Sequence, residues 1–110
     1  MKAAERHDIP IGRMNAILRR DLAALWDTDE RSVRGIIARM RKQQGDGLAI
    51  LSSSTSPAGY WRSADIGEIR AFIAETTARA RNTLAALEDA RRVLNEAESR
   101  RDYPDSVLWR

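Results

Sequence analysis

Cysteine is absent from this chain of 110 residues, and histidine occurs once, at His7. Without thiols there is no disulfide and no thiolate metal site, and a single imidazole leaves no Ser-His-Asp triad and no multi-histidine zinc site. Asp8 next to His7 is a pair of polar neighbours on a terminal segment. No glycine-rich phosphate loop and no paired carboxylates in an apolar context occur. We therefore expect a binding protein that is not an enzyme, with no catalytic residues, no cofactor and no metal.

Long apolar runs are also missing. No stretch of about 18 apolar residues occurs, and the N-terminal sequence lacks the apolar core of a signal peptide. These absences predict no membrane partner and a cytoplasmic location. Proline occurs three times, at positions 10, 57 and 104, so none interrupts the segment between residues 64 and 101.

The charge that is present is distributed unevenly. The net charge is +3, but residues 1–63 hold 11 Lys and Arg against 7 Asp and Glu, whereas residues 64–110 hold 8 against 9. Five cations of the first part lie within twelve residues: Arg31, Arg34, Arg39, Arg41 and Lys42. Such clustering is typical of a surface that binds phosphate.

Residues 12–43 carry apolar positions three and four apart, the spacing of helices that bury one face. We predict a short helix near 12–17, a second near 20–26 and a third over 30–43, the last capped by Thr28 or Asp29. A short strand around residues 18–19, or one continuous helix in place of the first two, are alternatives that this spacing leaves open.

The helix over residues 30–43 has two unlike faces. One is apolar and consists of Val33, Ile36, Ile37 and Met40. The opposite face is polar and basic and contains Gly35, which either lets a ligand approach the backbone or is a neutral feature of an exposed site. A buried face opposite an open basic face is what a DNA recognition helix needs.

Residues 45–63 predict a β-hairpin. Gly45 and Gly47 end the helix, residues 48–53 form a strand, 54–58 a polar loop and 59–63 the return strand. Tyr60 and Trp61 point to opposite faces, so one ring packs into the core. Arg62 is on the Tyr60 side, where we expect it to reach a phosphate.

Residues 64–101 predict one long helix, with Asp65 and Glu68 as a capping box. About 36 residues would span roughly 50 Å, too long to be covered by a domain of this size. Its apolar stripe therefore needs a partner: a second copy, another protein or a fold-back. We favour a coiled-coil homodimer, parallel or antiparallel, through the following residues: Ile73, Ala80, Leu84, Leu87, Ala90 and Leu94.

The two ends are expected to lie outside these elements. Residues 1–11 predict a flexible N-terminal arm that ends at Pro10. Residues 102–110 predict a tail that leaves the helix at Pro104, and its apolar residues Val107, Leu108 and Trp109 would pack on the fold, pack in a dimer or act as a peptide ligand.

The motif order is similar to that of a known family. It runs Asn15-Ala16-Ile17, Leu22-Ala23, Arg31-Ser32-Val33-Arg34, Ile37, Met40-Arg41, Ile50-Leu51-Ser52-Ser53 and Gly59-Tyr60-Trp61. Over residues 10–80 it resembles small winged-helix proteins of bacteriophages and prophages, and the N-terminal domain of biotin-repressor-type regulators. The resemblance implies a mainly α fold with a small β-hairpin: a winged helix-turn-helix at 12–63 and a long C-terminal helix.

In that family the second helix of the motif enters the major groove and the wing touches the DNA backbone or the minor groove. This chain departs from the pattern in its longer wing, which lacks a basic residue at the tip. No ligand-binding or catalytic domain follows, so no biotin-related activity is implied.

These observations lead to one main hypothesis and one alternative. The main one is a phage or prophage transcription regulator or replication accessory that binds double-stranded DNA. The candidate DNA-binding residues are Thr28, Arg31, Ser32, Arg34, Gly35, Arg39, Arg41, Lys42, Ser53, Ser54 and Arg62. Those near the start of the helix would read bases, and those near its end would hold phosphates. The alternative is a protein-interaction module that acts through the long helix without DNA, favoured by the phosphate-repelling Asp27, Asp29 and Glu30.

Overall fold

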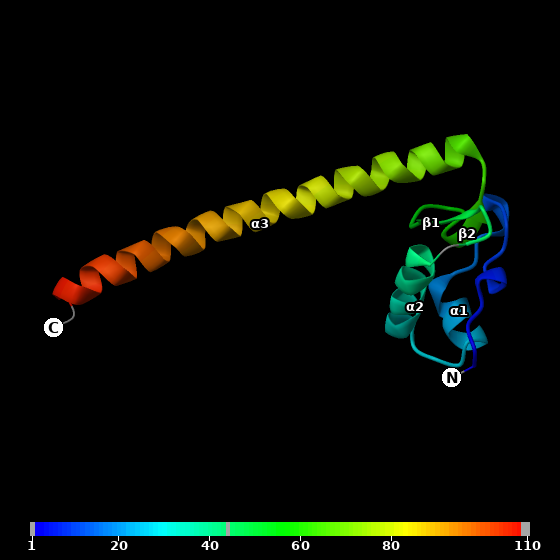
Figure 1. Cartoon of the computed structure of the whole chain (residues 1–110), viewed down its shortest axis with the longest axis horizontal. Helices are drawn as coiled ribbons and strands as arrows, with labels where there is room; N and C mark the ends of the chain where they lie inside the picture. Colours follow the sequence, from blue (N-terminus) through cyan, green and yellow to red (C-terminus); the bar gives the residue numbers. More distant parts are fainter. Residues whose placement is uncertain (1, 44, 109–110) are drawn as a thin grey trace. The chain divides into compact units, whose positions relative to one another are not determined.

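The computed structural model describes residues 2–43 and 45–108, with side chains described up to residue 100 (Figure 1). It is mainly helical, with a two-stranded antiparallel hairpin and a long C-terminal helix, as the sequence predicts. The chain divides into two units, Met1–Ile73 and Ala74–Arg110. The first contains every element except the greater part of the long helix.

Helices α1 (Arg19–Leu25) and α2 (Glu30–Lys42) form the centre of the first unit. Asp29 caps α2, because its carboxylate accepts a hydrogen bond from the Ser32 amide at 2.6 Å. The apolar face predicted for α2 is confirmed. Its residues pack with α1 in one core: Leu22, Ala23, Trp26, Val33, Ile36, Ile37 and Met40.

Strands β1 (Ala49–Ser53) and β2 (Gly59–Ser63) form the predicted hairpin, with Leu51 opposite Trp61. Ile50 joins the helical core, whereas Leu51 and Trp61 are buried on the other face. Ile17 pairs with Tyr60 through two backbone hydrogen bonds of 2.8 and 2.9 Å. The strand expected near residues 18–19 is thus a single bridge just before α1.

Gly59 is required by that bridge. Its φ is +121°, and a Cβ at this position would lie 2.2 Å from the Ile17 carbonyl oxygen. Only glycine accommodates both the dihedral angle and the approach of the second backbone.

The N-terminal segment differs from the prediction of a flexible arm. Ile9 is fully buried in the core, and the Lys2 amide donates to the Trp26 carbonyl at 3.0 Å. Asp8 accepts a hydrogen bond from Trp26 Nε1 at 2.8 Å. Residues Arg6–Asp8 form a short 3-10 helix. One isoleucine before a proline carries no periodic signal, so sequence spacing alone did not indicate this packing.

The helix expected near residues 12–17 is only a 3-10 turn, Arg13–Asn15. It is short because Gly12 enters it at a φ of +91° and because Ile17 is already paired with β2. The 3-10 turn Arg13–Asn15 and α1 are separate elements, so the alternative of one continuous helix is wrong.

Helix α3 covers Ile66–Leu108. Asp65 caps it by accepting from the Glu68 amide at 2.8 Å, but Glu68 accepts from Trp61 Nε1 at 2.6 Å instead of completing a capping box. The helix continues past Pro104, so the predicted exit there is wrong. A proline in a helix interior removes one backbone hydrogen bond and often kinks the helix, but it does not end α3, which runs four residues further to Leu108. The side chains of Val107 and Leu108, and Trp109 altogether, lie outside the described residues.

Candidate nucleic-acid interface

The solvent-facing side of α2 is the strongest candidate for a binding surface. All five cations of α2 are exposed. Arg41 also contacts the hairpin, and the other four are Arg31, Arg34, Arg39 and Lys42. Within the described residues, none of the four forms an ion pair. Their charge is therefore free to attract a polyanion.

Gly35 lies on the same side of α2. A Cβ added there would meet no atom within 4 Å. The position has neither a backbone strain nor a packing contact that requires glycine, so the side chain is missing from an open part of the basic face. A ligand backbone can approach α2 closely at this point.

Most of the acidic residues at the start of α2 have partners within the fold. Glu30 pairs with Arg19 at 3.2 Å, which joins α2 to α1. Asp29 caps α2, and the hydrogen bonds from the backbone and side chain of Ser32 lower its pKa. Thr28 and Ser32 are half-buried beside this cap, and Asp27 is exposed. Two of the three carboxylates that argued against phosphate binding therefore have partners in the protein.

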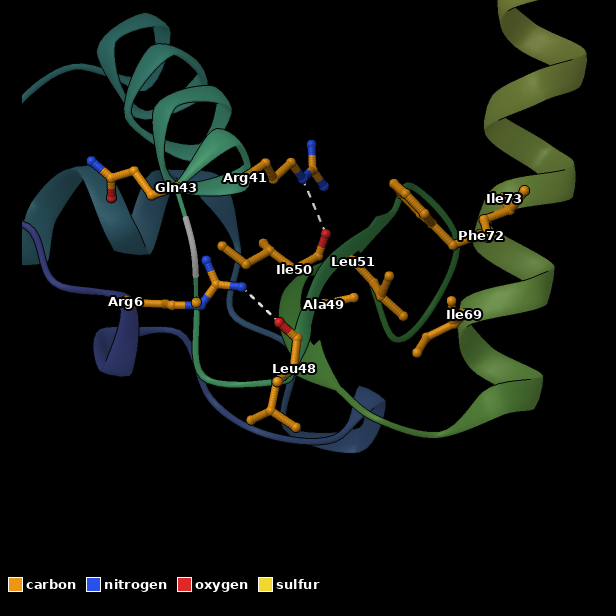
Figure 2. A pocket seen from close by; sticks show the side chains of 12 residues that line it. Arg6, Arg41, Gln43, Leu48, Ala49, Ile50, Leu51, Ile69, Phe72 and Ile73 are labelled. Carbon is orange, nitrogen blue, oxygen red and sulfur yellow. Dashed lines mark hydrogen bonds between the residues drawn. The ribbon is translucent and has the colours of Figure 1, made fainter.

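Arg41, which the sequence predicts to hold a phosphate, contacts the hairpin. Its Nε donates to the Ile50 carbonyl at 3.0 Å, and its guanidinium lies 5.3 Å from the centre of the Phe72 ring (Figure 2). Burial lowers the pKa of Arg41. The guanidinium of Arg41 therefore stabilises the contact between α2 and β1.

Arg62, which the sequence predicts to contact a phosphate, does not extend from the hairpin but is held within the fold. Its side chain is 12% exposed, with Nη1 2.6 Å from Asp46 Oδ2 and Nε 2.6 Å from the Ile9 carbonyl. Arg62 does lie on the Tyr60 side of β2, as the sequence predicts, but the N-terminal segment covers that side. Arg62 is a structural residue that holds this segment on the hairpin.

Arg6 and Asp46 complete the same cluster, and the sequence did not single out either. Arg6 donates to the carbonyl oxygens of Met40 and Leu48 and pairs with Asp46 at 3.2 Å. Burial raises the pKa of Asp46, but hydrogen bonds from Arg62, the Leu48 backbone and Arg6 outweigh it and lower that pKa to about 2. No local pattern links positions 6, 46 and 62.

A guanidinium from outside the hairpin, that of Arg13, lies against the hairpin loop, and the sequence did not predict this contact. Arg13 Nη2 donates to Ser53 Oγ at 3.1 Å and to Thr55 Oγ1 at 3.3 Å, and the group lies 5.4 Å from the Trp61 ring. Ser54 is exposed next to these hydroxyls. The tip predicted to lack a basic residue therefore has Arg13 against it.

A largely apolar cavity of about 510 Å³ opens in the first unit, where α2, β1 and the first turns of α3 meet (Figure 2). Its side chains include Leu48, Leu51, Ile69 and Phe72. The guanidiniums of Arg6 and Arg41 also line it, but each hydrogen-bonds a backbone carbonyl. Among the residues with described positions, no group of acids or His could hold a metal ion.

The second unit presents an uncovered apolar stripe on α3. Leu84, Leu87 and Leu94 are 57%, 44% and 56% exposed, and Ala80 and Ala90 are exposed between them. Ile73, the remaining predicted dimer contact, is also exposed but belongs to the first unit. Val93 is a further exposed apolar residue that the predicted stripe omitted. No described helix is long and apolar enough to span a bilayer.

Comparison with known proteins gives no relative: no family model, no curated protein and no solved structure matches this chain.

Proposed function

We propose that the chain is a winged helix-turn-helix protein that binds double-stranded DNA through α2. The observation that carries this proposal is the face of α2, with Arg31, Arg34, Arg39 and Lys42 exposed and without ion pairs among the described residues. The opposite face of the same helix is buried on α1. A rigidly seated helix with a free basic side suits the major groove.

Positions along α2 suggest different roles. Arg31 and Arg34 lie in the first turns, where side chains of such helices reach base edges, and Gly35 lets the backbone come close. Arg39 and Lys42 lie near the end and would contact phosphates. The hydroxyls of Ser53 and Ser54, with Arg13 beside them, are the candidate wing contacts.

The test is fluorescence anisotropy with random-sequence duplex DNA at about 50 and about 200 mM salt. Contacts to several phosphates predict a steep loss of affinity between these concentrations, by about 10³-fold for six contacts. A double variant, Arg39→Ala with Lys42→Ala, should bind all sequences more weakly and reduce the salt dependence. Arg81→Ala with Arg100→Ala is the matched control, because it removes the same charge from exposed positions of α3.

The outcomes are distinct. Weaker binding by the α2 variant alone supports the proposed surface. Equal weakening by both pairs indicates attraction to net charge, and no binding at 50 mM salt contradicts DNA binding altogether. If a specific site is then selected, Arg31→Ala should cost about 1–3 kcal/mol on that site and little on other sequences.

The exposed leucines of α3 support a second part of the proposal, that two copies associate through this helix. Half-exposed leucines that repeat along one helix face are unfavourable in water and are relieved by pairing with a second apolar stripe. Analytical ultracentrifugation of the wild type and of Leu87→Glu tests it: we expect a dimer that the substitution converts to a monomer. A different protein as the partner of α3, without DNA binding, is the competing interpretation.

On this proposal the chain acts in the cytoplasm as a phage- or prophage-type transcription regulator or replication accessory. Selection of a specific site, after the anisotropy experiment, would identify the operator that it reads.

A further inference from the structure

We propose that α3 pairs with a second copy of itself in the antiparallel direction, about a two-fold axis that passes next to Leu87. This inference deepens the self-association proposed above and is independent of DNA binding by α2. It concerns only residues 76–98 of α3, where the helix is described and its leucine side chains are exposed.

The centre of the apolar stripe can be located from helix geometry. At about 100° per residue, five positions fall within about 20° of one line on the helix surface. They are Thr76, Ala80, Leu87, Leu94 and Glu98. Thr83 and Arg91 lie about 40° from this line, on opposite sides, and Leu84 and Ala90 about 60° from it, whereas Val93 faces elsewhere.

The five positions are symmetric about Leu87, at −11, −7, 0, +7 and +11 residues. A two-fold antiparallel pair centred there therefore brings each residue level with its mirror position. Ala80 lies level with Leu94 of the partner subunit, and Leu87 with its own copy. A large side chain then faces a small one on either side of the axis, which is the arrangement that lets two helices interdigitate. A two-fold interface requires this kind of self-complementary surface.

Two-fold parallel pairing fits the same residues poorly. Every position would then lie level with its own copy. The alanine layer at Ala80 would leave a gap, and the two Glu98 carboxylates would face each other close to the middle of the seam, where like charges are destabilising. Antiparallel pairing places Glu98 level with Thr76 of the partner subunit instead. Both the sizes of the facing side chains and the position of the Glu98 charge therefore favour the antiparallel direction.

The direction of helix pairing determines how far apart the first units of the two copies are attached to the paired helices. In this register Ile73 lies level with residue 101 of the partner subunit. At 1.5 Å per residue, the two copies of Ile73 are then separated by about 42 Å along the helix axis. A parallel pair would instead start both helices at the same level.

Single cysteines test the proposal directly, because the chain has none. The full-length variants Ala80→Cys, Leu87→Cys and Leu94→Cys are prepared separately, and also mixed in pairs, and then oxidised mildly with diamide. Leu87→Cys should cross-link to itself. Ala80→Cys mixed with Leu94→Cys should form the heterologous disulfide at least tenfold faster than either variant forms its own. Gel mobility of non-reduced samples gives the yields.

Other outcomes overturn the proposal. Rapid self-cross-linking of Ala80→Cys and of Leu94→Cys indicates parallel pairing, and preferential cross-linking of Leu87→Cys to Leu94→Cys indicates a different axis. Absence of cross-linking by Leu87→Cys, together with a monomer in the ultracentrifuge, defeats both the direction and the self-association. None of these results bears on DNA binding, which the anisotropy titration decides separately.

Discussion

Arg62 Nη1 lies 2.6 Å from Asp46 Oδ2, and through this contact β2 holds the turn that follows α2. Arg6 reaches the same carboxylate from the N-terminal segment at 3.2 Å. Three segments that are distant in sequence therefore meet at one carboxylate. The cations of this cluster stabilise the fold, whereas those on the open face of α2 are free for a ligand.

Replacing Arg62 with alanine should destabilise the protein by about 1.5–3 kcal/mol, because the partly buried guanidinium hydrogen-bonds both a carboxylate and the Ile9 carbonyl. Urea unfolding followed by tryptophan fluorescence measures this loss. Arg31→Ala, the control, removes the same charge from an exposed site and should change stability by less than about 0.5 kcal/mol. Equal effects of the two substitutions would refute the structural role of Arg62.

Stability should fall in acid through Asp46. Its pKa in the folded chain is about 2, below the value of about 3.9 for an unfolded aspartate. The carboxylate therefore stabilises the folded state above about pH 4, and this contribution is lost as the pH falls from about 4 towards 2. In thermal unfolding across this range, Asp46→Asn should be less stable than the wild type at pH 7, with a difference that shrinks below pH 4. A constant difference contradicts the assignment.

Gly35→Ala should have opposite effects on stability and on DNA binding. Alanine at this open helical position should stabilise the free protein by about 0.5–1 kcal/mol. If the backbone of α2 approaches DNA here, the added methyl group should weaken binding in the anisotropy assay. Unchanged affinity with higher stability shows that this part of α2 does not touch DNA.

Gly59→Ala should be among the most damaging single substitutions. Its Cβ would collide with the backbone of Ile17, in addition to the cost of a φ of +121°. Gly47→Ala is the matched control, since its φ is also positive, at +83°, but nothing lies within 4 Å of its Cβ. The control should lose about 1–2 kcal/mol and Gly59→Ala clearly more. Thermal unfolding of the two variants compares them.

Periodicity was sufficient to predict α2, because the alternation of buried and exposed residues is a local property. The same is true of the hairpin, where Gly59 marks the start of the return strand. The inclusion of Ile9 in the core could not be predicted, since its partners are contributed by α1, α2 and β1. Arg62 illustrates the limit: its side of the strand was inferred correctly, but the segment that covers that side has no signal in the sequence.

Glu68 shows a different limit. Its spacing from Asp65 fits a capping box, and Asp65 does cap α3. The side chain of Glu68 is instead within 2.6 Å of Trp61 Nε1, a donor that is otherwise buried. The local motif predicted the start of α3 correctly. The carboxylate of Glu68, however, binds Trp61 through a tertiary contact that the motif could not predict.

The position of the N-terminal segment also constrains how the chain folds during synthesis. Arg6 binds the carbonyl of Leu48, 42 residues later, and Ile9 receives its hydrogen bond from Arg62, 53 residues later. This segment is synthesised before α1 and α2 but is therefore among the last to find its partners. Until residue 62 emerges from the exit tunnel, Ile9 has no completed core, and the nascent chain must carry α1 and α2 with part of their apolar surface exposed.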